Sequence, residues 1–524
     1  MEILLTVVLL LAAVGAMSWL AEKISVPAPV LFALAGVAWS IVPRVPKPEI
    51  SPAIVLAVFL PPLLYSDAWQ ASWLDFRRWV RPILQLAIGL VVFTILTVGV
   101  AAHWLMPALP WGACFVLGGI VSMTDTVAVH SVLERLRVPR RATAILEGEG
   151  LVNDATGLLG VELATVVVLT GVFGFSGIAT GFARIAGLGV ILGAAVGFAA
   201  ARLNQVLRGT QVLFAFSLVA PYAAYLLAEE AGASGVLAVV IAGFVASWRV
   251  HDIAPESRVD LYAAWDQMES LLNGLMFLFI GLEAPRRLVQ AVETVPGIVS
   301  AALLVSLTVI GARIVWIVPN AYLPLWLFPA LRRREGTYPS MKAVALVSWC
   351  GVRGAVSLAA ALSLPKTLGD GTPFPGRVAI VACTLAVILV TLIGQGVTLL
   401  PLARRLGLED AEPLEAEEKK AREAILTAGI ARLDAFCSEE QCPIAVYRLR
   451  ESMVDQLAAL KEEDEAERTH AQQRMAVTEE VRRAVYEAQS RSLLELRDRE
   501  VVNDRVHQFL QLELDRANVE LRPA

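Results

Sequence analysis

The chain of 524 residues is 56% hydrophobic and 18% charged, and its mean hydropathy of +0.63 exceeds that of a soluble globular protein of this length. Its formal net charge of -5 argues against a nucleic-acid partner, and its five cysteines are too scattered for a disulfide framework. The composition therefore predicts a chain that is solvated mostly by lipid.

Apolar segments long enough to cross a bilayer, which takes roughly 20 residues each, recur through the first 400 residues. Because the first segment follows Glu2 and has no convincing cleavage site, we expect a retained helix and not a signal peptide. We predict thirteen spanning helices, at 3–20, 26–43, 51–69, 82–106, 111–133, 142–170, 182–201, 210–228, 234–248, 263–282, 296–318, 340–364 and 377–400.

The basic residues predict the orientation of these helices. Loops after odd-numbered segments hold about 16 Lys and Arg residues, whereas loops after even-numbered segments hold about 5. Since basic loops stay in the cytoplasm, we expect the N-terminus outside and the C-terminal tail inside.

Charge density rises sharply after the last apolar segment. Residues 1–400 hold 47 charged residues, whereas 401–524 hold 46 in less than a third of the length. We predict a transmembrane domain at 1–403 and a cytoplasmic tail at 404–524. Apolar residues three or four apart between charges predict that the tail forms amphipathic helices, which cover the inner face or dimerise.

Carboxylic acids lie inside several predicted spans. An ionised acid near the middle of a spanning helix costs roughly 2.5–3.5 kcal/mol, so such acids are functional-site candidates. Three of them lie close together in EGEGLVNDATG at 147–157. The full set is Asp67, Asp125, Glu147, Glu149, Asp154, Glu162, Asp266, Glu269 and Glu283.

Arg353 is the intramembrane cation at comparable depth, because Arg313 and Arg377 lie nearer the ends of their predicted segments. A buried guanidinium needs a carboxylate partner. We therefore expect one acid to be structural and the others to hold protons or cations.

Two predicted spans carry signals of interruption. Thr124-Asp125-Thr126 supplies side chains that compete for backbone hydrogen bonds, and Gly351 and Gly354 flank Arg353. Interrupted helices offer free carbonyls and helix ends that coordinate ions in secondary transporters. Helix packing through small residues is the alternative explanation for the two glycines.

Motifs for other chemistries are missing from the sequence. It has no HExxH, no His pair on one helix face and no GxxxxGK[ST] loop. We therefore expect no cofactor and no use of ATP, so that transport draws on an ion gradient.

Five motifs in chain order resemble the bacterial sodium/proton antiporters of the NhaP/NHE type, within the cation/proton antiporter superfamily. They are LPPLLYSDAW at 60–69, TDTVAV at 124–129, EGEGLVNDATG at 147–157, LMFLFIGLE at 275–283 and GVRGAVSLAAALSLP at 351–365. The tail stretch 496–515 resembles that of the long-tailed bacterial branch.

The resemblance implies an all-α polytopic membrane protein with thirteen spans, inverted six-helix repeats and two discontinuous crossing helices. It also implies a homodimer in the bacterial plasma membrane, and hence the bilayer as its surroundings. The activity that it implies is exchange of Na⁺ for H⁺.

The same resemblance assigns the site residues. Asp154 corresponds to the cation- and proton-binding carboxylate and Asn153 to its partner. Thr124 and Asp125 belong to the unwound part of the first crossing helix, and Asp67 falls near the acidic position of the third span.

Arg353 corresponds to the core arginine, which would pair with an acid such as Glu149 or Asp125. The chain departs from the family pattern at Gly150, where many members carry a serine, so one hydroxyl ligand is missing there.

The residue types also suggest a mechanism. A hard monovalent cation such as Na⁺ is held best by the carboxylate, hydroxyl and carbonyl oxygens that Asp154, Asp67, Thr124 and the backbone offer. Burial favours the protonated form of a carboxylate, so H⁺ and Na⁺ compete for Asp154. Asn153 removes one titratable charge, and the family's Asn-Asp members are generally electroneutral, which implies one H⁺ per Na⁺.

Two other readings of the sequence remain. A K⁺-preferring antiporter is open, whereas a nucleotide- or glutathione-gated potassium efflux protein is disfavoured because 401–524 lack a GxGxxG loop. An intramembrane aspartyl enzyme using Asp125 and Asp154 would need a GxGD motif, which the sequence lacks, so we expect no enzyme.

Overall fold

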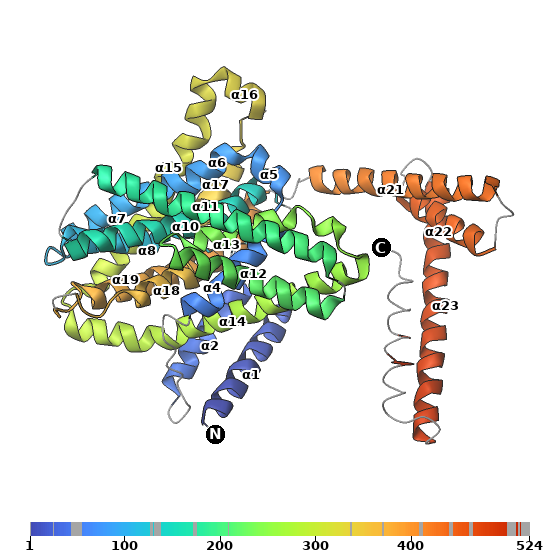
Figure 1. Ribbon diagram of the computed structural model, residues 1–524, viewed down its shortest axis with the longest axis horizontal. Helices are drawn as coiled ribbons and strands as arrows, with labels where there is room; N and C mark the ends of the chain where they lie inside the picture. Colours follow the sequence, from blue (N-terminus) through green and yellow to red (C-terminus); the bar gives the residue numbers. More distant parts are fainter. Residues whose placement is uncertain are drawn as a thin grey trace. The chain divides into compact units, whose positions relative to one another are not determined.

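The computed structural model describes residues 2–24, 26–42, 55–125, 129, 138–170, 175–207, 209–335, 338–368, 371–407, 412–439, 444–460, 465–499, 510–511 and 514. The chain divides into two compact units, Met1–Asp410 and Ala411–Ala524. Both are built from helices in their described parts, and Figure 1 labels these helices.

The helices of the first unit begin and end as follows: α1 Glu2–Lys23, α2 Ala28–Ile41, η1 Val55–Phe59, α4 Leu60–Gln70, α5 Trp73–Arg78, α6 Val80–Leu84, η2 Gln85–Leu90, α7 Val91–Leu105, α8 Trp111–Ser122, α10 Arg140–Thr170, α11 Phe175–Val206, α12 Thr210–Glu230, α13 Gly235–Ser247, η3 Val250–Asp252, α14 Pro255–Thr294, α15 Ile298–Leu327, α16 Pro329–Glu335, α17 Met341–Trp349, α18 Ala355–Ser363, α19 Arg377–Leu389, η4 Val390–Gln395 and α20 Gly396–Leu406. The segments η1, η2 and η4 are π-helical turns that continue into α-helices.

Seven helical stretches in the described part are long and apolar enough to cross a membrane. They are Leu4–Lys23, Val80–Leu105, Arg141–Leu169, Ala183–Val206, Thr210–Glu230, Ile298–Leu327 and Arg377–Leu406. The helices α2, α8 and α13 are apolar but shorter. The predicted all-α membrane fold is confirmed, whereas the count of thirteen spans and the inverted repeats stay predictions.

Both predicted helix interruptions are present. Helix α8 ends at Ser122 and is followed by extended backbone at Met123, and residues 350–354 separate α17 from α18. The two interruptions meet, because the N–H of Asp125 donates to the carbonyl of Val352 at 2.8 Å. Thr126, which also belongs to the first predicted interruption, lies outside the described residues.

Small residues allow α11 and α13 to pack with their backbones in contact. Three glycines one helical turn apart on α11 face carbonyl oxygens one turn apart on α13 and its N-cap residue, at 2.9, 2.3 and 2.6 Å from the Cβ that a larger residue would carry. The pairs are Gly189 with Ser234, Gly193 with Ala238 and Gly197 with Ala242. Since the residue numbers increase in the same direction along both helices, the two helices run parallel.

Helices α2 and α14 meet in the same way. A Cβ at Gly36 would lie 2.2 Å from the carbonyl oxygen of Leu278, and one at Gly281 would lie 2.0 Å from that of Ala33. This close approach fixes α14, which carries several of the intramembrane acids, against the N-terminal part of the unit.

The second unit contains α21 Glu412–Glu439, α22 Ile444–Leu460 and α23 Glu465–Asp498, drawn at the red end of the colour scale in Figure 1. Arg450 of α22 pairs with Asp434 of α21 at 2.6 Å, and Arg474 of α23 forms a two-pronged contact with Asp455 of α22. The predicted helices of the tail are therefore present. Most of the family-like stretch 496–515 lies outside the described residues.

We predict that Gly193→Val destabilises the protein by about 1–3 kcal/mol, because the added side chain would overlap the backbone of α13. Thermal melting of the detergent-solubilised protein measures this effect. Gly187→Val is the matched control on the same helix, since a Cβ there meets no described heavy atom within 4 Å. Equal melting temperatures for the two variants would contradict the close packing.

Candidate functional site

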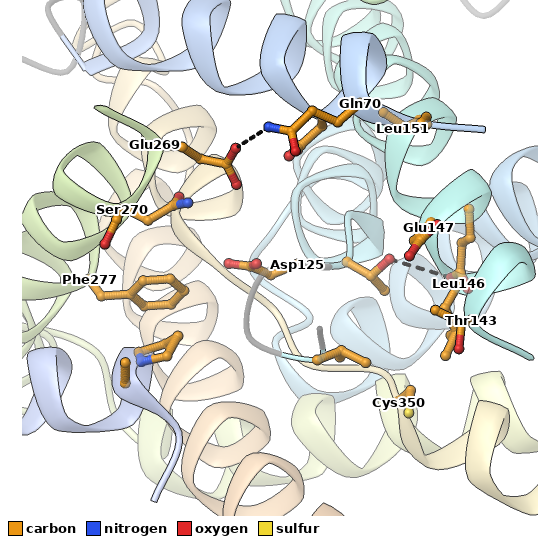
Figure 2. Close-up of a pocket in the computed structure, with 18 of the residues that line it drawn as sticks. Gln70, Asp125, Thr143, Leu146, Glu147, Leu151, Glu269, Ser270, Phe277 and Cys350 are labelled. Carbon is orange, nitrogen blue, oxygen red and sulfur yellow. Dashed lines mark hydrogen bonds between the residues drawn. The ribbon is translucent and has the colours of Figure 1, made fainter. Parts of the chain in front are cut away.

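A cavity of about 550 Å³ lies between α2, α4, α10, α14 and the two interruptions. Figure 2 shows Gln70, Asp125, Glu147 and Glu269 around it, contributed by different segments of the chain. The acids that line it are Asp67, Asp125, Glu147, Glu149, Asp266 and Glu269. Together they make the cavity attractive to cations and repellent to anions.

A second, smaller cavity of about 50 Å³ reaches Asp154. Asp67, Thr124, Asp125 and Asn273 line both cavities, so they form the boundary between the two. The predicted residues Asp67, Thr124, Asp125 and Asp154 are therefore brought together around one small space.

Polar contacts fix α4 against α14 beside the larger cavity. The hydroxyl of Ser66 donates to Oε2 of Glu269 at 2.8 Å. The amide of Gln70 donates to the Ser66 hydroxyl at 3.0 Å and to Oδ1 of Asp266 at 3.3 Å. These bonds hold the helix turn that carries Asp67.

Asn153 and Asp154 are adjacent on α10 but have different surroundings. The side-chain amide of Asn153 donates to the hydroxyl of Thr124, which in turn donates to Oε1 of Glu149 at 3.4 Å. The Oδ1 atoms of Asn153 and of the buried Asp154 both have no hydrogen-bond partner among the described residues. Asn153 is thus tied into a network through its amide nitrogen, whereas Asp154 offers a free oxygen on a group that can carry a negative charge.

A buried ion pair joins Glu149 of α10 to Arg313 of α15. Their side chains are 2% and 1% exposed, and the contact is bidentate, with Nη1 to Oε1 at 2.5 Å and Nη2 to Oε2 at 2.8 Å. Arg313 also donates to the carbonyl of Val347 on α17, from Nε at 3.3 Å and from Nη2 at 3.2 Å. One guanidinium therefore connects three helices.

The predicted pairing of Arg353 with Glu149 is wrong, because Glu149 pairs with Arg313. Arg353 instead donates from its guanidinium to the carbonyl of Ser122, the last residue of α8. Its backbone N–H donates to the hydroxyl of Thr391 at 3.0 Å. The C-terminal end of a helix carries free carbonyls and a partial negative charge, so it is a suitable partner for a buried cation.

The sequence prediction missed Arg313 because it ended the span at 318, before Pro319. Helix α15 continues to Leu327 through Pro319 and Pro324, which places Arg313 at its middle. Neighbouring helices can compensate for proline in a membrane-spanning helix. The available signal was the apolar run after Pro319, which is long enough to extend the helix.

The match with a family of known proteins covers most of the chain. The family model described as "Sodium/hydrogen exchanger, transmembrane" matches residues 8–405. The chain belongs to this family.

Relatives with similar sequences carry related descriptions. A sodium, potassium, lithium and rubidium/H⁺ antiporter of Bacillus pumilus is 30% identical over 478 residues, which cover 86% of this chain and 69% of the relative. An uncharacterised Na⁺/H⁺ exchanger of Mycobacterium tuberculosis is 32% identical over 528 residues and covers 99% of this chain and 96% of its own length. The second match extends through the tail.

The fold is similar to that of a solved structure, the sodium proton antiporter MjNhaP1 of Methanocaldococcus jannaschii. The TM-score is 0.59 at 21% identity, and the match covers 78% of this chain and 99% of the other. With the family and the fold agreeing, this exchanger is a multi-pass membrane protein whose activity class is cation/proton antiport.

We predict that Glu149→Gln destabilises the exchanger by about 3–5 kcal/mol, because the change leaves the Arg313 guanidinium buried without its counter-charge. Thermal melting in detergent tests this. The double variant Glu149→Gln with Arg313→Met removes both charges and should regain a large part of the loss. A single variant that melts like the wild type would show that the ion pair does not support the fold.

Proposed function

We propose that this exchanger moves Na⁺ and H⁺ in opposite directions, with Asp154 as the carboxylate that binds either ion. The observation that carries the proposal is the unpartnered Oδ1 of Asp154, which lines the small cavity beside the two helix interruptions. A buried carboxylate oxygen without a hydrogen-bond donor is stabilised either by a proton or by a cation, and not by both at once.

Mutual exclusion at Asp154 is the coupling step. When Na⁺ binds, its charge neutralises the carboxylate, and when Na⁺ leaves, a proton takes over that role. The neutralised carboxylate is the form that can change its exposure from one side of the membrane to the other, because moving a bare charge through a low-dielectric region is costly. Each cycle then exchanges one ion for the other.

The remaining predicted residues have separate roles. Asp67, Thr124 and Asp125 lie at the boundary of the two cavities, where their oxygens can replace water around an arriving cation. Asn153 is a positioning residue, since its amide holds the Thr124 hydroxyl. Glu149 is neutralised by Arg313 and therefore does not compete with Asp154 for the ion.

The larger cavity is the proposed entrance from the cytoplasm. It is lined by Gln70 and Ala71 at the end of α4 and by Thr143 near the start of α10. These helix ends are next to basic residues, with Arg77 and Arg78 after α4 and Arg141 in α10. The positive-inside rule places such ends in the cytoplasm.

The transported cation has a second candidate, K⁺. The Bacillus pumilus relative is described as accepting sodium, potassium, lithium and rubidium, which supports a site with broad selectivity. We keep Na⁺ as the first assignment because the matched family is described as a sodium/hydrogen exchanger. Comparing Na⁺, Li⁺, K⁺ and Rb⁺ in everted vesicles with a pH-sensitive dye distinguishes the two.

The exchanger would work as a homodimer in the bacterial plasma membrane, with its N-terminus outside and residues 404–524 in the cytoplasm. It would exchange one H⁺ per Na⁺ without a cofactor, ATP or enzymatic activity, and so contribute to pH homeostasis.

We predict that Asp154→Asn reduces cation-dependent pH changes in everted vesicles to the background level, because an amide neither titrates nor carries the charge that attracts a cation. Glu162→Gln is the control, since Glu162 is an exposed acid two turns further along the same helix. Wild-type exchange by Asp154→Asn would overturn the carrier assignment.

We also predict that exchange by the wild type carries no net charge and that Asn153→Asp introduces a current, because the variant adds a second titratable group beside the first. Purified protein adsorbed on a solid-supported membrane reports this current after a Na⁺ jump. A current of the wild type itself would contradict the one-to-one stoichiometry.

A further inference from the structure

Ser357 has a hydroxyl group with no function in the site described so far. It lies in the first turn of α18, is 1% exposed, and its Oγ has no hydrogen-bond partner among the described residues. A buried hydroxyl without a partner costs about 1–3 kcal/mol. A ligand that bonds to this hydroxyl would remove that cost.

Two other buried serines of this unit, Ser306 and Ser348, are satisfied by their own helices. Ser306 donates to the carbonyl of Ala302 at 2.7 Å, and Ser348 donates to that of Val344 at 2.7 Å, each four residues earlier. For Ser357 the corresponding residue is Arg353, which lies in the non-helical segment. The helix interruption thus deprives Ser357 of the helical carbonyl four residues earlier that Ser306 and Ser348 use.

Ser357 lines the small cavity together with Asp154. Both groups carry a buried oxygen without a partner, and they come from different helices, α18 and α10. They do not bond to each other, and the cavity between these walls has a volume of about 50 Å³. Since one water needs roughly 10–15 Å³, this space has room for a small cation with part of its hydration shell.

We propose that the hydroxyl of Ser357 is a ligand of the transported cation, opposite Asp154. This assignment rests on the proposed function of Asp154. The lone pairs of Oγ would coordinate the cation, as neutral oxygens do for hard ions, and would add no charge to the site. The second interrupted helix then contributes a side chain as well as its backbone.

The N-terminal end of α18 carries a partial positive charge, which alone would repel a cation. The structure compensates for it with Asp125, whose carboxylate lies directly against the backbone of Gly354, where any Cβ would overlap Oδ2. Glycine at 354 therefore lets an acid approach the helix end that carries Ser357. The negative charge of Asp125 therefore offsets the repulsion between the positive helix end and a cation near Ser357.

Gly150 gives the proposal an independent test, because it lines the same cavity from α10, four residues before Asp154, and has no side chain. A serine at 150 would present a hydroxyl to the same space from the same helix face as Asp154. It should therefore replace the hydroxyl that a Ser357 variant lacks.

The experiment measures cation binding by purified, detergent-solubilised protein through the rise of its melting temperature with Na⁺ and, separately, with Li⁺. For Ser357→Ala we expect the half-maximal concentration to rise about tenfold, as the loss of one hydroxyl ligand implies. Without added cation the variant should melt at or above the wild-type temperature, because an unsatisfied buried hydroxyl has been removed.

Ser363→Ala is the matched control on α18, since the Ser363 hydroxyl donates to the carbonyl of Ala360 at 2.9 Å. Its half-maximal concentration should stay at the wild-type value. Gly150→Ser in the Ser357→Ala background should recover most of the lost affinity.

An unchanged Na⁺ and Li⁺ affinity of Ser357→Ala would overturn the ligand assignment, and so would a loss of melting temperature without cation, which indicates a structural role. Neither result would contradict the proposal that Asp154 binds the cation and the proton. Exchange by Asp154→Asn would overturn the proposed function itself, so the two failures are distinguishable.

Discussion

The buried ion pair between Arg313 and Glu149 is the interaction on which the site depends. In a low-dielectric interior an unpaired charge is far more costly than a bidentate pair, so these two side chains hold α10, α15 and α17 in one arrangement. The pair also orders the polar network, because Glu149 accepts from Thr124, which accepts from Asn153. A structural charge pair thus positions the groups that flank Asp154.

This arrangement separates the acids of EGEGLVNDATG by their surroundings. Glu149 is neutralised and structural, Glu147 lines the larger cavity, and Asp154 keeps an oxygen without a donor. Three carboxylates within eight residues of one helix therefore differ in availability to a cation, although their chemistry is the same.

The two helix interruptions form the site because their backbones contact each other. Their contact from Asp125 to Val352 brings the end of α8 and the start of α18 together. Arg353 then meets the carbonyl end of α8, and Asp125 meets the amide end of α18. Each helix end faces a side chain of opposite charge, which stabilises broken helices within a membrane.

The sequence by itself determined the membrane class, the helical tail and both interruptions, because apolar length and polar residues at membrane depth are local signals. The grouping of Asp67, Thr124, Asp125 and Asp154 was implied by the resemblance of the motifs to a known family. It did not determine which acid pairs with which arginine. Arg313 was missed since a proline made its helix look shorter than it is, and Ser357 looked like an ordinary helix residue. Only the tertiary structure decided both. The partner of Arg313 lies on a helix far away in sequence. Ser357 follows a non-helical segment, and no neighbouring described helix offers its hydroxyl a partner.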